Sequence, residues 1–112
     1  MRIAVLGSAG QLGRDLCPRL VGEVVPLTRA DLDLGNPAGV AAALAAARPN
    51  VLVNCAAYNF VDKAETEPEA AFAVNAWGVR ALAQACAAAK VKLVHFSTDY
   101  VFGLDAARTT PF

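Results

Sequence analysis

The chain has no excess of charge of either sign. Its 112 residues carry 10 Lys and Arg side chains against 10 Asp and Glu side chains, so the formal net charge is zero. Proteins that bind nucleic acid or an anionic membrane surface through their overall charge need a basic patch. The composition therefore predicts no nucleic-acid partner and no membrane-surface partner.

Long hydrophobic runs are absent as well. The uncharged segment 34–47 contains Gly, Asn and Pro, and it is shorter than the roughly 20 apolar residues that cross a bilayer. The sequence is typical of a strand from Arg2 onward, without the basic and apolar regions of a signal peptide. We therefore predict a cytoplasmic protein with no membrane-spanning segment.

Cysteine is scarce, and its spacing is not that of a metal site. Cys17, Cys55 and Cys86 are odd in number, lie far apart and form no Cys-x-x-Cys pair. Such cysteines are typical of reduced thiols in a cytoplasmic protein. We predict free thiols, most of them buried, and no metal site.

A glycine-rich turn follows the first apolar run of the chain. Ile3-Ala-Val-Leu6 leads into Gly7-Ser-Ala-Gly10-Gln-Leu-Gly13 and then into an amphipathic stretch. Gly7 is expected to make the tight turn, Gly10 to let the backbone approach phosphates, and Gly13 to let the helix pack close to the strand. The first N–H groups of that helix favour a pyrophosphate. The alternative is a βα turn without a ligand, because glycine triplets also arise by chance.

Strand and helix patterns alternate along the chain. Strands are predicted at 2–6, 23–27, 51–53 and 92–97, and helices at 12–20, 37–48 and 67–89. Asn36 is a predicted helix N-cap, with Pro37 at the first helical position. Pro26 indicates an outer or distorted position for the second strand, because proline cannot donate to a sheet ladder.

Strands joined by helical crossovers form parallel sheets with right-handed connections. We therefore predict an α/β fold with a Rossmann-like, doubly wound parallel sheet of about four strands, in the order 3-2-1-4. Ligand is then expected at the carboxyl ends of strands one and four. A complete sheet of this kind has six strands, so residues 1–112 are predicted to be the N-terminal part of a dinucleotide-binding domain, without a substrate domain.

The residues after the second strand indicate which coenzyme fits. An acidic residue at this strand end accepts from the ribose hydroxyls, whereas an arginine accommodates a 2′-phosphate. Thr28 and Arg29 occupy the strand end, and Asp31 and Asp33 follow, where a side chain can reach the adenine. Arg29 thus favours NADPH, or the use of both coenzymes, over NADH alone. The alternative for Arg29, Asp31 and Asp33 is a solvated loop.

Small and hydroxyl-bearing residues follow the third and fourth strands. Ala56 and Ala57 leave room for a ribose or ring to approach. Thr98 offers a hydroxyl that can donate to a substrate carbonyl oxygen, or that simply bonds to the backbone.

Three other side chains are given structural interpretations. His95 lies in an apolar strand and is predicted to be a core histidine with a partner, and Trp77 is predicted to pack. The amide of Asn75 falls on the apolar face of the long helix, so it is predicted to be buried. Burial requires partners, which are expected in the fourth strand or in the crevice.

Six segments together resemble the dTDP-4-dehydrorhamnose reductases, which are extended short-chain dehydrogenases/reductases. They occur in order along essentially the whole chain: GSAGQLG at 7–13, DLGNP at 33–37, RPNVLVNCAAY at 48–58, VDKAE at 61–65, VNA at 74–76 and STDYVF at 97–102. The resemblance implies reduction of the 4-keto group of a dTDP-linked sugar with NADPH or NADH, in the cytoplasm, for cell-surface polysaccharide synthesis. It implies a nucleotide-sugar substrate and leaves homo-oligomer formation open.

The resemblance also implies roles for individual residues. Thr98 corresponds to the catalytic hydroxyl residue and Tyr100 to a residue near the substrate. The residues that correspond to coenzyme contacts are Gly7, Gly10, Gln11, Leu12 and Gly13 at the pyrophosphate, Asp33 and Leu34 at the adenine, and Ala56, Ala57 and Tyr58 along the coenzyme.

The chain departs from the family in its catalytic residues. The family's Tyr-x-x-x-Lys pair, whose tyrosine protonates the carbonyl oxygen, does not occur in residues 1–112. Asn59 and Phe60 also stand where the family usually has threonine and a small residue. The chain alone is therefore expected to be close to inactive.

Three alternatives to this reductase remain open. The first is a non-catalytic, regulatory member of the superfamily, similar to the beta subunit of methionine adenosyltransferase. The second is another nucleotide-sugar reductase or epimerase, and the third is a stand-alone nucleotide-binding module.

Overall fold

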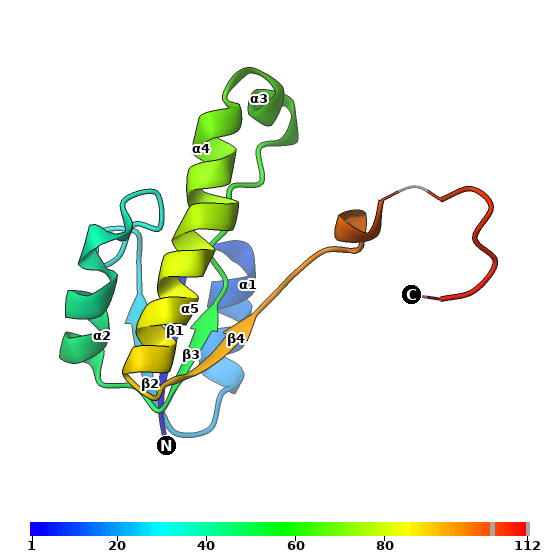
Figure 1. Cartoon of the computed structure of the whole chain (residues 1–112). Helices are drawn as coiled ribbons and strands as arrows, with labels where there is room; N and C mark the ends of the chain where they lie inside the picture. Colours follow the sequence, from blue (N-terminus) through cyan, green and yellow to red (C-terminus); the bar gives the residue numbers. More distant parts are fainter. Residues whose placement is uncertain (104, 112) are drawn as a thin grey trace.

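The computed structural model describes residues 1–103 and 105–111. Its strands form one parallel sheet: β1 (Arg2–Leu6), β2 (Glu23–Leu27), β3 (Val51–Asn54) and β4 (Lys92–His95). The α-helices are α1 (Gln11–Leu16), α2 (Val40–Ala47), α3 (Val61–Thr66), α4 (Pro68–Phe72) and α5 (Val79–Ala88), and they lie on both sides of the sheet (Figure 1). The predicted class, an α/β fold with a doubly wound parallel sheet, is confirmed.

The predicted strand order 3-2-1-4 is wrong. The order is β2-β1-β3-β4, because β3 pairs with the second edge of β1 rather than with β2. Residues 28–36 form turns and no strand, and the 3₁₀ turn Pro37–Gly39 then leads into α2. The chain continues from α2 into β3, which lies beside β1. The winding therefore reverses between β1 and β3, so the crevice of the sheet lies at the carboxyl ends of these two strands and not of β1 and β4. β2 is an outer strand, as Pro26 predicts.

Alternate residues of the strands face two separate apolar layers. Ala4, Leu6 and Leu52 are buried against α2 and α5, whereas Ile3 and Val5 are buried against α1 and the 3₁₀ turn that follows it. Strands that are apolar on both faces need helices on both sides. This two-sided burial holds the central strands β1 and β3 at a fixed register below the crevice.

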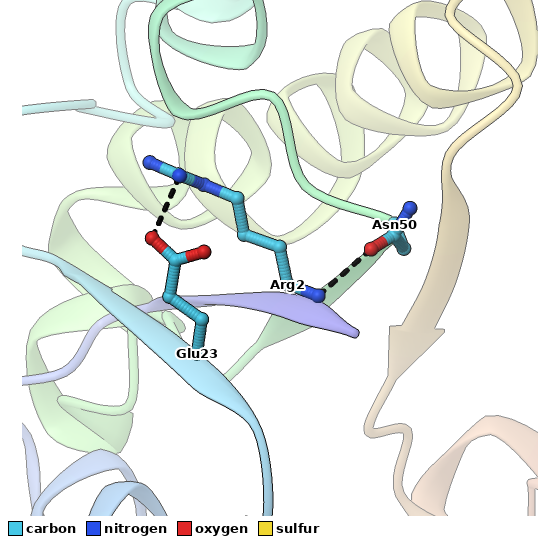
Figure 2. Close-up of polar contacts among 3 residues, drawn as sticks. All are labelled: Arg2, Glu23 and Asn50. Atoms are coloured by element: carbon cyan, nitrogen blue, oxygen red, sulfur yellow. Dashed lines mark hydrogen bonds and ion pairs between the residues drawn. The ribbon is translucent and has the colours of Figure 1, made fainter.

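Polar contacts fix the register at the opposite, amino end of the sheet (Figure 2). Arg2 Nη1 donates to Glu23 Oε1 at 2.7 Å, across a directly paired position of β1 and β2. The backbone N–H of Arg2 donates to Asn50 Oδ1 at 2.7 Å, and the carbonyl of Asn50 accepts from the Lys92 N–H at 3.0 Å. Asn50, the residue before β3, thus holds the starts of β1 and β4 in place.

Two predicted helices are shorter or more divided than expected. Pro18 ends α1 early, and a 3₁₀ turn (Cys17–Arg19) follows, because proline has no N–H for the helical ladder. The predicted helix 67–89 consists of α4, a π-helical segment (Ala73–Gly78) and α5. Asn36 does precede the first turn before α2, but its side chain makes no capping bond.

One helix was missed by the sequence analysis. The residues of α3 carry no apolar periodicity, so nothing in the pattern separates them from a loop. No helix in the described residues is both long and apolar enough to cross a membrane.

Several burial predictions are wrong. β4 is an outer strand, and His95, its last residue, is exposed instead of lying in the core. Trp77 is also 59% exposed instead of packed. The three cysteines are free, as predicted, but only Cys86 is buried, and Cys17 and Cys55 are half-buried.

Candidate functional site

The glycine turn after β1 is pinned to both neighbouring strands. Gly7 has a φ of +76°, a left-handed conformation that favours glycine. The N–H groups of Gly7 and Ser8 both donate to the carbonyl of Leu27, at 3.0 and 3.1 Å. A Cβ at Gly7 would lie 2.7 Å from the backbone nitrogen of Ala56. The turn therefore fits closely between the ends of β2 and β3.

Gly13 and Gly10 differ in what surrounds them. A Cβ at Gly13 would lie 2.3 Å from the carbonyl oxygen of Gly7, so α1 packs directly on the turn. A Cβ at Gly10 would meet only the Gly7 carbonyl oxygen, at 3.2 Å, and Gly10 has an ordinary φ of −76°. A Cβ is thus excluded at position 13, whereas at position 10 it needs a shift of only a few tenths of an ångström from the Gly7 carbonyl oxygen.

A cavity of about 930 Å³ opens at the carboxyl ends of β1 and β3. Gly13 lies behind the turn and does not line it. Asp31 does not line it either. The other residues that the sequence assigns to the coenzyme all line this one cavity: Gly7, Gly10, Gln11, Leu12, Arg29, Asp33, Leu34, Ala56, Ala57 and Tyr58.

The amino end of α1 faces this cavity. Gly10 is the N-cap residue, and no side chain accepts a bond from the first turn of the helix. Gln11 and Leu12, the first helical residues, line the cavity. The unpaired N–H groups at a helix start attract anions.

Two carboxylates shape the loop after β2 in different ways. Asp31 Oδ2 accepts from the backbone N–H of Thr28 at 2.7 Å and from its hydroxyl at 2.8 Å. These bonds, the backbone one first, lower the pKa of Asp31. Asp31 does not line the cavity, so the structure assigns it to the turn and not to the adenine.

Asp33 does line the cavity. Its Oδ1 accepts from the Gly35 N–H at 2.8 Å, and its Oδ2 accepts from Arg29 Nε at 3.1 Å. The bond from Gly35 is the main cause that lowers the pKa of Asp33, and Arg29 lowers it further. Asp33 is therefore an ionised group at the edge of the cavity.

Two asparagines hold the segment after β3. The side chain of Asn54, 1% exposed, accepts from the Ala56 N–H at 3.0 Å, and its amide nitrogen lies 3.1 Å from His95 Nδ1. Asn75 binds both backbone groups of Tyr58: its Oδ1 accepts from the N–H at 2.8 Å, and its Nδ2 donates to the carbonyl at 2.7 Å. The predicted burial of Asn75 is wrong, but its partner lies at the crevice, one of the two predicted places.

Aromatic side chains form the rim of the cavity beyond Ala57. The hydroxyl of Tyr58 donates to Glu67 Oε2 at 3.1 Å, and its ring packs edge-on against Phe60, with 5.6 Å between the centroids. Lys63 Nζ lies 5.6 Å from the centroid of Phe60. Desolvation first, and then the bond to Glu67, raise the pKa of Tyr58.

Part of the cavity wall comes from residues of the strands, helices and loops that the sequence did not assign to the site. The only signal for the helical residues is their small size on one face. The missed lining residues are Leu6, Asp15, Leu32, Gly35, Asn36, Cys55, Asn59, Phe60, Ala70, Ala73 and Val74.

The structure does not bring Thr98 and Tyr100 to the cavity. The chain after β4 runs away from the sheet (Figure 1), and neither residue is among those that line the cavity. Thr98 Oγ1 accepts from the Tyr100 N–H at 3.3 Å, which starts the last 3₁₀ turn (Asp99–Phe102). The side chain of Tyr100 is 89% exposed.

Replacing Asn75 by alanine is expected to lower the free energy of unfolding by about 1–2 kcal/mol. The variant leaves the two backbone groups of Tyr58 without their protein partner, and a lost hydrogen bond costs about 1 kcal/mol. Urea unfolding followed by circular dichroism measures the change. Gln84→Ala, at an exposed helical amide, is the matched control; equal losses in both variants would contradict the assigned role of Asn75.

The fold and the site together define a class. A doubly wound parallel sheet, a glycine turn after β1 and a cavity at the point where the winding reverses are the features of Rossmann-like α/β proteins. The chain belongs to the family described as the RmlD substrate binding domain, whose model matches residues 1–112.

Relatives with similar sequences carry one recurring name. A dTDP-4-dehydrorhamnose reductase of Streptomyces griseus is 50% identical over 104 residues, which cover 90% of this chain and 34% of that protein. A dTDP-4-dehydrorhamnose reductase of Sinorhizobium fredii is 46% identical, over 100% of this chain and 38% of its own length. The chain thus spans little more than a third of these curated relatives.

Solved structures show the same likeness. A dTDP-4-dehydrorhamnose reductase of Bacillus anthracis, in complex with NADP, is 38% identical with a TM-score of 0.84, over 89% of this chain and 37% of that one. A dTDP-4-dehydrorhamnose reductase of Clostridium acetobutylicum is 38% identical with a TM-score of 0.87, over 100% of this chain and 40% of that one.

Proposed function

We propose that this chain forms the coenzyme-binding part of an NADPH- or NADH-dependent dTDP-4-dehydrorhamnose reductase. The observation that carries the proposal is the convergence of the glycine turn, the acidic loop after β2 and the small residues after β3 on one cavity. The names of the relatives, and the NADP complex of the Bacillus anthracis protein, support the choice of reaction and coenzyme. A cytoplasmic location and a nucleotide-sugar substrate belong to the same proposal.

The residues of the cavity suit the parts of a dinucleotide in order. The N–H groups at the start of α1 bind the diphosphate, and the absence of a side chain at Gly10 leaves it room. Arg29, Asp33 and Leu34 hold the adenosine end, whereas Ala56 and Ala57 leave space along the rest of the coenzyme. This fit depends on the absence of a side chain at position 10, where the backbone conformation does not itself require glycine.

The bound coenzyme supplies a hydride to the sugar carbonyl. Protonation of the carbonyl oxygen then needs an acid, and residues 1–112 contain no Tyr-x-x-x-Lys pair to provide it. General acid catalysis contributes about 10²–10⁴-fold in rate. We therefore propose that this chain binds the coenzyme but reduces ketosugar slowly. In the proposed reaction Thr98 is the hydroxyl that orients the substrate, and this role requires the chain after β4 to lie over the crevice.

Replacing Gly10 by leucine is expected to weaken NADPH binding at least about tenfold while the fold is kept. The φ of −76° at Gly10 suits any residue, a Cβ there needs only a small shift of the Gly7 carbonyl oxygen at 3.2 Å, and Gly10 lines the cavity. A leucine side chain therefore takes up space in a preformed site, which costs affinity. Isothermal titration calorimetry of the whole chain with NADPH and with NADH measures this, and circular dichroism reports the fold. Gly39→Leu is the control, because a Cβ there meets no atom within 4 Å.

Two outcomes would contradict the proposed function. A folded wild-type sample that gives no heat with either coenzyme would show that the cavity takes another ligand. Unchanged NADPH affinity in the folded leucine variant would show that the coenzyme does not lie along the glycine turn.

A further inference from the structure

The last residues of β3 and β4, Asn54 and His95, are paired across the sheet and meet through their side chains. Asn54 is buried, whereas His95 is exposed to solvent. Within the described residues, the partner of the Asn54 amide nitrogen is His95 Nδ1, at 3.1 Å. A buried amide without a partner is costly, so Asn54 depends on a side chain that water can reach.

The orientation of the Asn54 amide determines where the proton of His95 lies. Asn54 Oδ1 accepts from the backbone N–H of Ala56 at 3.0 Å, and a backbone N–H can only donate. The amide oxygen is therefore turned toward Ala56, and the amino group is turned toward the imidazole ring. His95 Nδ1 must then accept, which requires a neutral ring that carries its proton on Nε2.

Ala56, at the other end of these two bonds, is part of the candidate site. It lines the cavity together with Gly7. A Cβ at Gly7 would lie 2.7 Å from the Ala56 backbone nitrogen, so the glycine turn packs directly on this backbone. A shift of Ala56 therefore changes the surface against which the proposed coenzyme lies.

We propose that neutral His95 is a positioning residue for the coenzyme, which acts through Asn54 to hold the Ala56 backbone against the glycine turn. The inference rests on the proposed function. Protonation of His95 places an N–H on Nδ1, so that two donors face each other across 3.1 Å. The Asn54 amide can restore this bond only by turning over, which removes the acceptor of the Ala56 N–H. Acid therefore releases Ala56 and weakens coenzyme binding.

The charged groups around His95 do not bind it. The charged side chains of the adjoining elements are Arg80 on α5, Lys92 on β4 and Asp99 in the last 3₁₀ turn, and β3 carries none. No carboxylate forms an ion pair with His95 in the part of the chain that the structure describes. Histidine side chains exchange their proton between about pH 5 and 8, so the bond to Asn54 is expected to be made and lost in this range.

The first test is nuclear magnetic resonance of the whole chain without coenzyme. His95 is the one histidine of the sequence, so the ring nitrogen signals of an untagged sample belong to it. At about pH 8 we expect the Nε2–H tautomer, and between about pH 8 and 5 we expect the Ala56 amide signal to move as the ring is protonated. An Nδ1–H tautomer, or an Ala56 signal that does not follow the ring, overturns the inference and leaves the proposed function untouched.

The second test is calorimetry with NADP⁺ at about pH 8 and about pH 5. From the higher to the lower pH, the affinity of the wild type is expected to fall about fivefold more than that of His95→Gln, because one hydrogen bond is lost. Glutamine offers an oxygen to Asn54 and does not titrate, so this variant is expected to bind as the wild type does at about pH 8. Comparing the two proteins at each pH cancels the titration of the ligand and of Asp15 and Asp33, which also line the cavity.

Two further variants check the role of the acceptor. His95→Leu removes it and is expected to bind NADP⁺ about fivefold more weakly than His95→Gln at both pH values. Lys92→Gln removes a charge at another exposed position of β4 and is expected to keep the pH dependence of the wild type. Equal pH dependence in the wild type and in His95→Gln overturns the inference. If the wild type binds NADP⁺ at neither pH, the proposed function itself fails.

Discussion

Replacing Gly13 by alanine is expected to lower the free energy of unfolding by about 2–3 kcal/mol. The new Cβ would lie 2.3 Å from the carbonyl oxygen of Gly7 and 2.6 Å from the Cα of Ser8, both backbone atoms of a pinned turn. Overpacking against rigid atoms costs about 1–3 kcal/mol or more. Alanine is favoured over glycine in helices by only about 1 kcal/mol, so the clash outweighs the gain in helix propensity.

Gly39→Ala is the matched control for this experiment. A Cβ at Gly39 meets nothing within 4 Å, and its φ of −83° suits any residue. The control is expected to be neutral or stabilising by up to about 1 kcal/mol. Urea unfolding measures both variants, and a Gly13→Ala protein as stable as the wild type would show that α1 does not pack on the turn.

Replacing Leu82 by alanine is expected to cost about 2–5 kcal/mol of unfolding free energy. Leu82 is fully buried, at 0% exposure, in the apolar layer between α5, α2 and the sheet. The truncation removes buried methyl groups and leaves a cavity that β1 and β3 cannot close, because they are packed on both faces. Thermal and urea unfolding of the variant measure the loss.

Trp77→Ala serves as the comparison, because it removes a larger side chain from the π-helical segment that continues into α5. Trp77 is 59% exposed, so its truncation is expected to cost less than about 1 kcal/mol. A larger loss for Trp77→Ala than for Leu82→Ala would mean that the helix is rotated about its axis relative to the structure described above.

The local features of the fold could be predicted from the sequence. Strands β1 and β2 begin and end where predicted. Strand bounds of this kind depend on local sequence, because an apolar run ends at the glycine or polar residues that flank it. The strand order could not be predicted, because it depends on which edge of β1 receives β3, a choice between distant segments. The exposure of His95 and Trp77 could not be predicted either, since it depends on which faces other elements cover.

The candidate site divides in the same way. The glycine turn, Arg29, Asp33 and the alanines after β3 could be placed together, because the carboxyl ends of neighbouring parallel strands meet at one edge. The bond between Asn75 and Tyr58 spans 17 residues, and the sequence predicted a partner in the crevice or the fourth strand but not which residue it is. Thr98 and Tyr100, predicted from resemblance, lie on a segment that the sheet does not hold.

The reversal of winding between β1 and β3 has a consequence for protein engineering. The connections leave these two strands in opposite directions, so connectivity sets where the hollow lies, and side chains of the surrounding loops and of the long helix form its walls. A library that randomises the exposed positions of 28–36, and keeps the buried Leu32 and Leu34 together with 1–13 and 51–57, is expected to retain that hollow in its folded members. Selection from such a library for binding to phosphorylated metabolites would measure how far the ligand of this hollow depends on the loop after β2.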